Sequence, residues 1–210
     1  MKKLLTIIIL LLSFCSTIAS AENQKRKYIK GKFYNSVEGN FLVATEEMRD
    51  PRFNKSVIVM FKNNKDGAWG LAINKPLGTI SLRELINKND LINIKKKELI
   101  DAKIPIFWGG PVERNKIFIL HSKEYKTKTT KNFNKISLSS DYNTLVKIAD
   151  DKGPKKKMVI IGFSSWAGGQ LEGEMERDHW ILSEIKIDLI FESDNLKKWI
   201  DAISKGFVIL

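Results

Sequence analysis

Residues 39–76 constrain the fold most, because three β-strand patterns follow one another there with turn residues between them. Phe41–Thr45 is rich in β-forming residues, and Val57–Phe61 is apolar at every position, which is typical of a strand covered on both faces. Asp66–Gly67 is a strong hairpin signal, and Ala68–Ile73 then runs back along the second strand. We therefore expect a buried three-strand unit whose second and third strands form a hairpin.

Helix-capping residues mark three further elements along the chain. Ser81 and Glu84 have the spacing of a capping box at the start of one helix. The run Ser139–Asp141 can cap a second helix that runs through Ala149, and Asp194 can cap a C-terminal one. These helices interrupt the strands at irregular intervals.

The remaining strand patterns do not alternate regularly with helices. A helix is expected to begin at Gln170 and to run through Arg177 as far as Trp180. The segment Lys123–Asn134 is either a solvated loop or an edge hairpin. Apolar runs predict four more strands, at Ile104–Trp108, Lys116–His121, Met158–Phe163 and Ile185–Phe191. An order that is β-rich first and mixed later favours an α+β fold over a doubly wound sheet.

The N-terminus has the three-part layout of a secretory signal peptide. Lys2 and Lys3 precede the apolar run Leu4–Leu12, and Ala19–Ala21 is a small-x-small cleavage site. The apolar run is too short to span a membrane. Cleavage after Ala21 would divide the chain into a signal peptide (1–21), a polar basic tether (22–36) and a single domain (37–210).

The cysteine content and the charge follow from this leader. Cys15, the only cysteine, would leave with it, so the mature chain would form no disulfide. A lipid-modified Cys15 is the alternative, although Phe14 is bulkier than the small residue that a lipobox has there. The formal charge of +12, or +10 without Lys2 and Lys3, comes mainly from lysine. Because specific phosphate and base recognition relies on arginine, this surplus fits an AT-rich genome better than a nucleic-acid footprint.

Three motifs give the chain a strong resemblance to the YqgE/AlgH family of bacterial proteins, also called DUF179 or UPF0301. The first is G-x-F-L-x-A-T from Gly39 with M-x-D-P-x-F-x-x-S-V-I from Met48 and G-A-x-G-L-x-I-N-x-P from Gly67. The second matches at Val112, Phe118, Leu120 and His121, and the third at Gly162, Trp166, Gly169, Gln170, Leu171, Glu172, Glu174 and Trp180. The resemblance covers about residues 37–207. At 115–117 this chain has Asn-Lys-Ile where the family has Asp-Arg-Gly, so the resemblance implies no ligand contact from that turn.

The resemblance implies a fold, and the leader implies a location. The family fold is a mixed, largely antiparallel sheet curled into a pseudo-barrel with flanking helices. Its members generally look cytosolic, so cytoplasmic location is the alternative to a periplasmic or otherwise exported protein. Some relatives carry transcription-regulator labels, which makes a nucleic-acid-associated regulator one alternative function. Export would separate such a protein from DNA.

The sequence favours no catalytic residue, cofactor or metal. Zinc requires three or four ligands, and only His121 and His179 would be available as nitrogen ligands. A serine hydrolase acting through Ser164 or Ser165 is a third function, with His121 as base and Asp178 or Glu172 orienting it. A structural role for His121, hydrogen-bonded at the strand terminus, is the simpler interpretation.

We therefore expect a non-enzymatic binding or regulatory domain for an unknown small ligand or protein. The predicted site lies where polar, glycine and aromatic residues concentrate, between the turn at 48–53, the turn at 109–111 and the loop at 166–172. Its candidate residues are Asp50, Arg52, Asn74, Gly109, Gly110, His121, Trp166, Gln170 and Glu172. Each of these also has a structural interpretation, such as a turn cap for Asp50 and Asn74 or a tight turn for the glycines.

Overall fold

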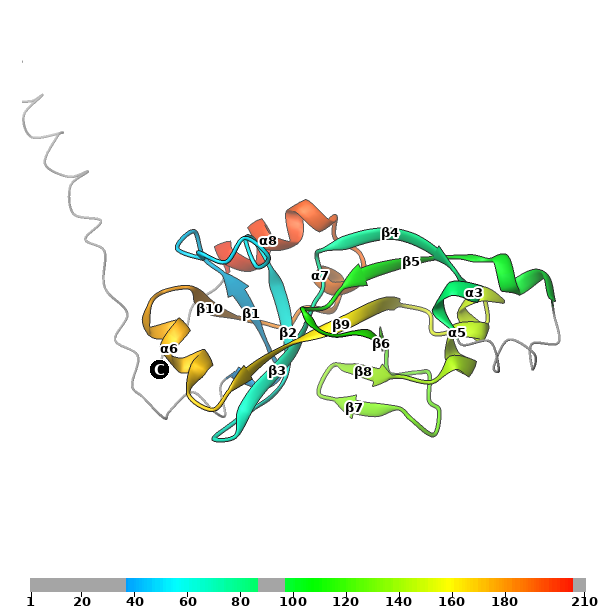
Figure 1. Ribbon diagram of the computed structural model, residues 1–210, viewed down its shortest axis with the longest axis horizontal. Coiled ribbons are helices and arrows are strands. Elements are labelled where there is room, and N and C mark those ends of the chain that lie inside the picture. Colours follow the sequence, from blue (N-terminus) through cyan, green and yellow to red (C-terminus); the bar gives the residue numbers. More distant parts are fainter. Residues whose placement is uncertain (1–36, 87–96, 206–210) are drawn as a thin grey trace, which may run out of the picture.

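The computed structural model describes residues 37–86 and 97–205, which form one curled mixed sheet with helices packed on it (Figure 1). The strands are β1 (Asn40–Ala44), β2 (Val57–Asn64), β3 (Gly67–Ala72), β4 (Pro76–Ser81), β5 (Lys103–Trp108), β6 (Val112–His121), β7 (Lys131–Phe133), β8 (Ile136–Ser139), β9 (Lys157–Ala167) and β10 (Trp180–Glu184). The helices are α3 (Leu82–Leu85), the 3₁₀ helix η1 (Lys97–Asp101), α5 (Tyr142–Ala149), α6 (Gln170–Glu176), α7 (Ile187–Phe191) and α8 (Asn195–Ser204). The predicted α+β class and the curled, largely antiparallel sheet are confirmed.

Strand β9 holds the two parts of the sheet together. The main path runs β10-β1-β2-β3-β9-β6-β8-β7, and β5 joins β9 in parallel while pairing with β4 on its other side. The end of β9 from Ser164 to Ala167 pairs with β3, and the part from Lys157 to Phe163 pairs with β6. Figure 1 shows β9 running through the length of the sheet.

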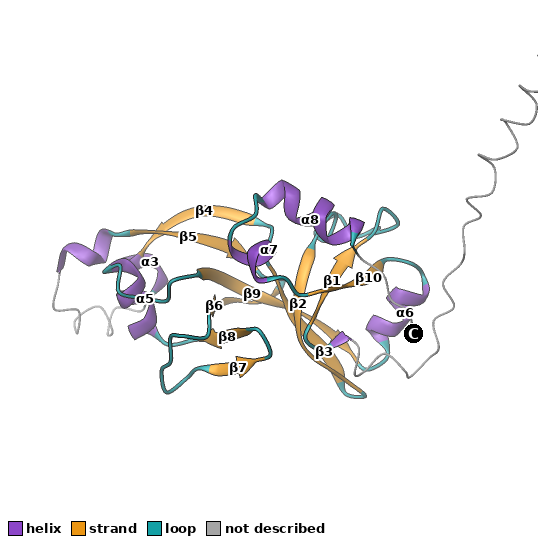
Figure 2. Ribbon diagram, turned by 180° about the vertical axis from the view of Figure 1, so that it is seen from behind, coloured by secondary structure: helices purple, strands orange, loops and turns teal. Residues whose placement is uncertain are grey.

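Apolar residues on both faces of the central strands explain why β2 lacks alternation in sequence. Val57, Val59 and Phe61 face the inner core of the curled sheet, whereas Ile58 and Met60 face a second core under α6. A third core lies between α3, α5 and the strands β5, β6 and β9. The helices thus gather at both ends of the molecule, and α7 and α8 cover one side (Figure 2). The prediction that β2 is covered on both faces is confirmed.

The predicted helix caps are present. The Ser81 backbone N–H donates to Glu84 Oε2 at 3.0 Å, and the Ser81 hydroxyl donates to the same oxygen. The Asp141 carboxylate accepts from the backbone N–H of Thr144 at 2.9 Å at the start of α5. Asp194 accepts from the backbone N–H of Leu196 at 2.9 Å at the start of α8. Short polar side chains at these positions satisfy amide groups that have no partner within the helix.

Several elements differ from the sequence-based expectation: strands β8 and β10 were not predicted, and helix α6 ends at Glu176 rather than reaching Trp180, which begins β10. The run Ile185–Phe191 is not the last strand: β10 ends at Glu184, and Ile187–Phe191 forms helix α7. Its apolar residues are buried at Leu189 and Ile190, adjacent positions that a helix places on one side, and tertiary packing outweighs the β propensity of the run. Strand β4 was not predicted, since its residues are mostly exposed and carry no buried alternation. Lys123–Asn134 contains an edge hairpin strand, β7, which pairs with β8.

Glycines allow two backbones to cross where β9 changes partners. A Cβ on Gly109 would lie 2.3 Å from the carbonyl oxygen of Gly162, and one on Gly110 would lie 2.1 Å from the carbonyl carbon of Phe163. Gly110 also has a φ of 155°, and Gly162 has a φ of 71°. The turn at 109–110 therefore needs glycine for close approach as well as for backbone conformation.

Candidate functional site

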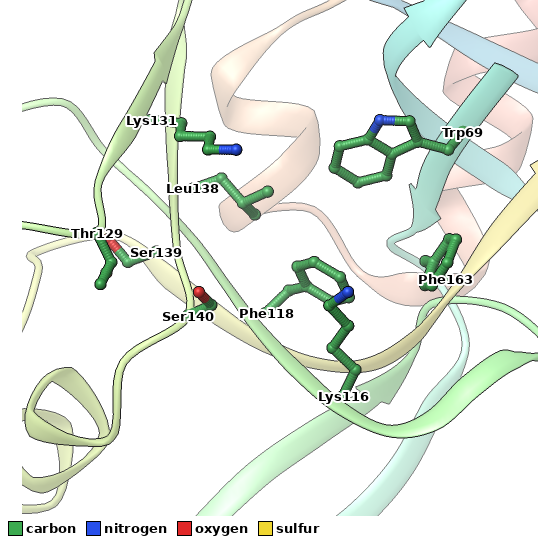
Figure 3. Close-up of a pocket in the computed structure, with 9 residues that line it drawn as sticks. All are labelled: Trp69, Lys116, Phe118, Thr129, Lys131, Leu138, Ser139, Ser140 and Phe163. Carbon is green, nitrogen blue, oxygen red and sulfur yellow. The ribbon is translucent and has the colours of Figure 1, made fainter.

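A pocket of about 340 Å³ opens on the inner side of the curled sheet, between the β2–β3 hairpin and the β7–β8 hairpin (Figure 3). Its volume lies in the range of pockets that hold small organic molecules. Residues from five strands and two loops line it: Trp69, Lys116, Phe118, Thr129, Lys131, Leu138, Ser139, Ser140 and Phe163. Most of these residues fall outside the motifs that predicted a site from the sequence.

Three aromatic rings form the apolar wall of the pocket. The ring centroid of Trp69 lies 6.0 Å from that of Phe118 and 6.1 Å from that of Phe163, and those two phenylalanines are 6.0 Å apart. Phe61 stacks on Trp69 at 4.8 Å and meets Phe133 edge-on at 4.6 Å. Packing from behind therefore fixes the tryptophan ring that faces the pocket.

Two lysines supply the positive charge of the pocket. Lys116 Nζ lies 5.7 Å from the ring centroid of Phe118 and 5.6 Å from that of Phe163, and it pairs with Glu113 at 3.0 Å. In Figure 3 the ammonium group of Lys131, on the edge strand β7, points across the pocket toward Trp69. Among the described residues, no carboxylate lies within ion-pair distance of Lys131. The pocket thus combines aromatic rings with ammonium groups.

The hydroxyl-bearing residues Thr129, Ser139 and Ser140 form the polar wall of the pocket. Two of them, Thr129 and Ser139, belong to hydrogen-bond networks that extend behind this wall. Ser139 Oγ is 2.9 Å from His121 Nε2 and 2.8 Å from Thr130 Oγ1. Asp141 Oδ2 accepts from Thr129 Oγ1 at 2.6 Å and from Thr127 Oγ1 at 3.0 Å. Although burial raises the pKa of Asp141, hydrogen bonds from Thr129, Thr144 and Thr127 outweigh it and lower that pKa.

His121 has a structural position at the end of this chain. Its Nδ1 is 2.8 Å from the Ser122 carbonyl oxygen, which only accepts, so Nδ1 carries a proton, and its Nε2 lies 2.9 Å from Ser139 Oγ. His121 is fully buried and Ser139 is 1% exposed, so an ester carbonyl has no direct approach to this pair. Ser164 Oγ instead donates to the Gly109 carbonyl oxygen at 3.0 Å. The structure therefore does not bring His121 together with Ser164 as a hydrolase would require.

The two candidate residues of the turn at 48–53, Asp50 and Arg52, form an ion pair with each other. Arg52 forms a bidentate pair with Asp50, with a shortest distance of 2.6 Å, and hydrogen bonding to Arg52 lowers the pKa of Asp50. Asn74 is buried, where its Oδ1 accepts from the Val57 N–H at 2.9 Å and its Nδ2 donates to the Lys55 carbonyl at 2.7 Å. Asn74 thereby fixes the turn that precedes β2.

The three predicted segments do meet, but aromatic rings fill the space between them. The ring of Phe53 lies 5.5 Å from Trp108, 6.4 Å from Trp166 and 5.6 Å from Trp180. Both Trp166 and Trp180 donate from Nε1 to Glu174 Oε2, at 2.9 and 2.7 Å. This carboxylate therefore holds the two indoles against the second core.

Gln170 and Glu172 differ in their surroundings. Gln170 accepts from the Ala167 N–H at 3.0 Å and donates to Glu174 Oε1 at 3.0 Å, so it closes the first turn of α6. Glu172 is 4% exposed, and its Oε1 has no hydrogen-bond partner in the described structure. Neither residue lines the aromatic pocket.

None of the helices described in the structure is long and apolar enough to cross a membrane. Within residues 37–86 and 97–205, histidine, cysteine, aspartate and glutamate side chains form no group of three that could hold a metal ion. The predicted signal peptide lies outside the described residues.

Comparison with known proteins identifies the family, because a family model described as AlgH-like (DUF179) matches residues 41–207. The chain belongs to the AlgH-like family. A UPF0301 protein of Cereibacter sphaeroides is 33% identical over 78% of this chain and 88% of its own length. One from Rickettsia africae is 34% identical over 82% of this chain and 89% of its own length.

Solved structures of the AlgH-like fold match as well. The solution structure of AlgH from Pseudomonas aeruginosa has a TM-score of 0.65 and 26% identity, covering 85% of this chain and 92% of that one. A crystal structure from Corynebacterium diphtheriae has a TM-score of 0.58 at 15% identity, covering 83% of this chain and 92% of that one, and shows the fold alone.

In this AlgH-like chain, sequence reasoning missed the pocket because its residues are spread over five strands. Trp69 lies in the first motif at a position the motif leaves variable, and Lys116 was noticed only as a departure from the family pattern. Lys131 lies in a segment that had the composition of a loop. Trp69, Phe118 and Phe163 come from β3, β6 and β9, which are neighbours in the sheet but far apart in sequence, so no local pattern joins them.

Proposed function

We propose that this AlgH-like protein is a non-enzymatic binding or regulatory domain that holds a small organic ligand in the aromatic pocket. The observation that supports the proposal is the cavity of about 340 Å³ walled by three aromatic rings. Apolar walls with a few polar groups are typical of ligand pockets. Binding without chemistry fits the pocket because two hydroxyl groups of its lining are already engaged, that of Ser139 with His121 and Thr130 and that of Thr129 with Asp141.

A pocket-filling variant tests this proposal. Ser140 is exposed at the rim, so Ser140→Trp would place a ring in the cavity with little effect on the core. Compounds from a fragment library that raise the melting temperature of the wild type should not stabilise Ser140→Trp. Ser140→Ala is the matched control, since it keeps the cavity open. Equal stabilisation of the wild type and Ser140→Trp would refute binding in the pocket.

We also propose that the protein is exported, on the strength of the leader at residues 1–21. N-terminal peptide mass spectrometry on fractionated cells tests this part separately. A mature start at Glu22 in the envelope fraction is the expected result. An intact Met1 in the cytosol would contradict it and would leave the basic surface open to a nucleic-acid test by salt titration.

A further inference from the structure

We infer that the ligand of this pocket is an aromatic anion, a planar ring that carries a carboxylate, sulfonate or phosphate group. The inference rests on the proposed binding function and adds the chemical class of the ligand. Its basis is the arrangement of Lys116 and Lys131 around the wall formed by Trp69, Phe118 and Phe163.

The aromatic wall favours a flat ring over a flexible chain. Phe118 and Phe163 meet edge-on, with their planes 79° apart, and Trp69 is nearly perpendicular to Phe163 at 81°. Rings in such an arrangement offer both edges and faces to a further ring, and offset or edge-on contacts between rings are favourable. The Trp69 ring is also held by Phe61 behind it, so binding would not have to order it.

The charged groups favour an anion at the mouth of the pocket. Lys116 has one carboxylate partner, Glu113, and both side chains of this pair are about half exposed, so the pair is weak and open to competition. Lys131 brings a second positive charge that no described carboxylate neutralises. A ligand carboxylate, sulfonate or phosphate between the two ammonium groups would form charge-assisted hydrogen bonds.

The half-buried Asp141 carboxylate has hydrogen-bond partners other than these lysines. The Asp141 carboxylate already accepts hydrogen bonds from Thr127, Thr129 and Thr144, including the Thr144 backbone N–H. Thr129 is the wall residue closest in sequence to Lys131, and its hydroxyl hydrogen points to Asp141. These hydroxyl and amide groups occupy acceptor sites of the Asp141 carboxylate, and Asp141 does not line the pocket, whose charged lining residues are Lys116 and Lys131.

Two dyes with the same aromatic framework separate the contributions of ring and charge. The fluorescence of 8-anilinonaphthalene-1-sulfonate and that of neutral N-phenyl-1-naphthylamine would each be titrated against the full chain. In Lys131→Met and Lys116→Met we expect the dissociation constant of the sulfonate dye to rise about tenfold each, whereas that of the neutral dye should not change. Lys128→Met, an exposed lysine of the adjacent loop, is the control for the loss of one charge.

The outcomes distinguish this inference from the proposed function. If both dyes bind equally and the lysine variants do not discriminate, the pocket binds apolar ligands and the anion inference is overturned. If neither dye binds, or if Ser140→Trp binds both as well as the wild type does, the proposed function itself fails. Displacement of the sulfonate dye by benzoate or phenyl phosphate, but not by inorganic phosphate, would support the aromatic requirement and rank the two anion types.

Discussion

Burial of Lys198 should make the stability of the protein rise with pH above neutrality. This lysine on α8 is 3% exposed, and its Nζ donates to the Ile73 carbonyl and to Asn195 Oδ1, both at 3.2 Å. Its Nζ also lies 5.6 Å from the ring centroid of Phe107. Burial lowers its pKa from 10.5 to about 8, and the charge of Asp194 offsets this only in part.

The size of the effect follows from proton linkage. Between pH 8 and 10.5 the unfolded chain, in which Lys198 has its ordinary pKa, binds more protons than the folded chain. Unfolding free energy therefore rises with pH in that window, as the cost of burying the charge is relieved. The full shift corresponds to about 3 kcal/mol, of which about 1 kcal/mol should be recovered between pH 7 and pH 9.

Lys198→Met isolates this contribution because methionine keeps the apolar stem without a titrating group. Urea unfolding followed by tryptophan fluorescence at pH 7 and pH 9 would give the stability of each protein. The difference between Lys198→Met and the wild type should change in favour of the wild type by about 1 kcal/mol over this interval. Lys197→Met, an exposed neighbour, should show no such change. Parallel pH profiles for the wild type and Lys198→Met would refute the reasoning.

Three other changes test contacts in the sheet and at its edge. Glu174→Gln removes the charge from the acceptor shared by two indole N–H groups, so urea unfolding should show a loss of about 1–3 kcal/mol, accompanied by a weaker near-ultraviolet circular dichroism signal. Gly110→Ala should cost more than about 3 kcal/mol in the same assay, because its Cβ would overlap the carbonyl carbon of Phe163. Gly39→Ala, with a φ of 78° but open space around it, should cost only about 1 kcal/mol, and equal losses for the two would contradict the close-approach argument. Because the folded-state pKa of Asp141 is lowered, its stabilisation is present above pH 4 and is lost as the pH falls further; Asp141→Asn should flatten that acid limb, and an unchanged limb would count against it.

The sequence predicted best those elements whose signal is local. The Asp66–Gly67 hairpin and the caps at Ser81, Asp141 and Asp194 depend on turn and capping chemistry within a few residues. Strand β4 and the change from β10 to α7 depend on packing between distant segments. The exposed Leu77 of β4 and the Ile187–Phe191 run therefore carried no usable pattern or a misleading one.

The candidate site was harder to predict because a motif gives the type and spacing of polar residues but not their neighbours in space. Asn74 and Gln170 each accept a hydrogen bond from a backbone N–H, that of Val57 and that of Ala167. Asparagine and glutamine commonly make such bonds in turns and at the starts of helices, so their presence does not indicate a ligand site. Glu174, which ties two indoles together, looked no different in sequence from Glu172 two residues earlier. Lys131 becomes part of a site only because β7 packs against the β2–β3 hairpin, where the Phe133 ring contacts that of Phe61.

The pairing of β1 with β10 has a consequence for the order in which the protein can be made and folded. Asn40 lies opposite Glu184, so the first strand of the sheet keeps an open edge until nearly the whole polypeptide has left the ribosome. β3 waits in the same way for β9. The local pairs β1–β2 and β2–β3 can form early, but closing the distant pairs is slow because their partners lie far along the chain. The sheet is therefore completed only after β9 and β10 have been synthesised.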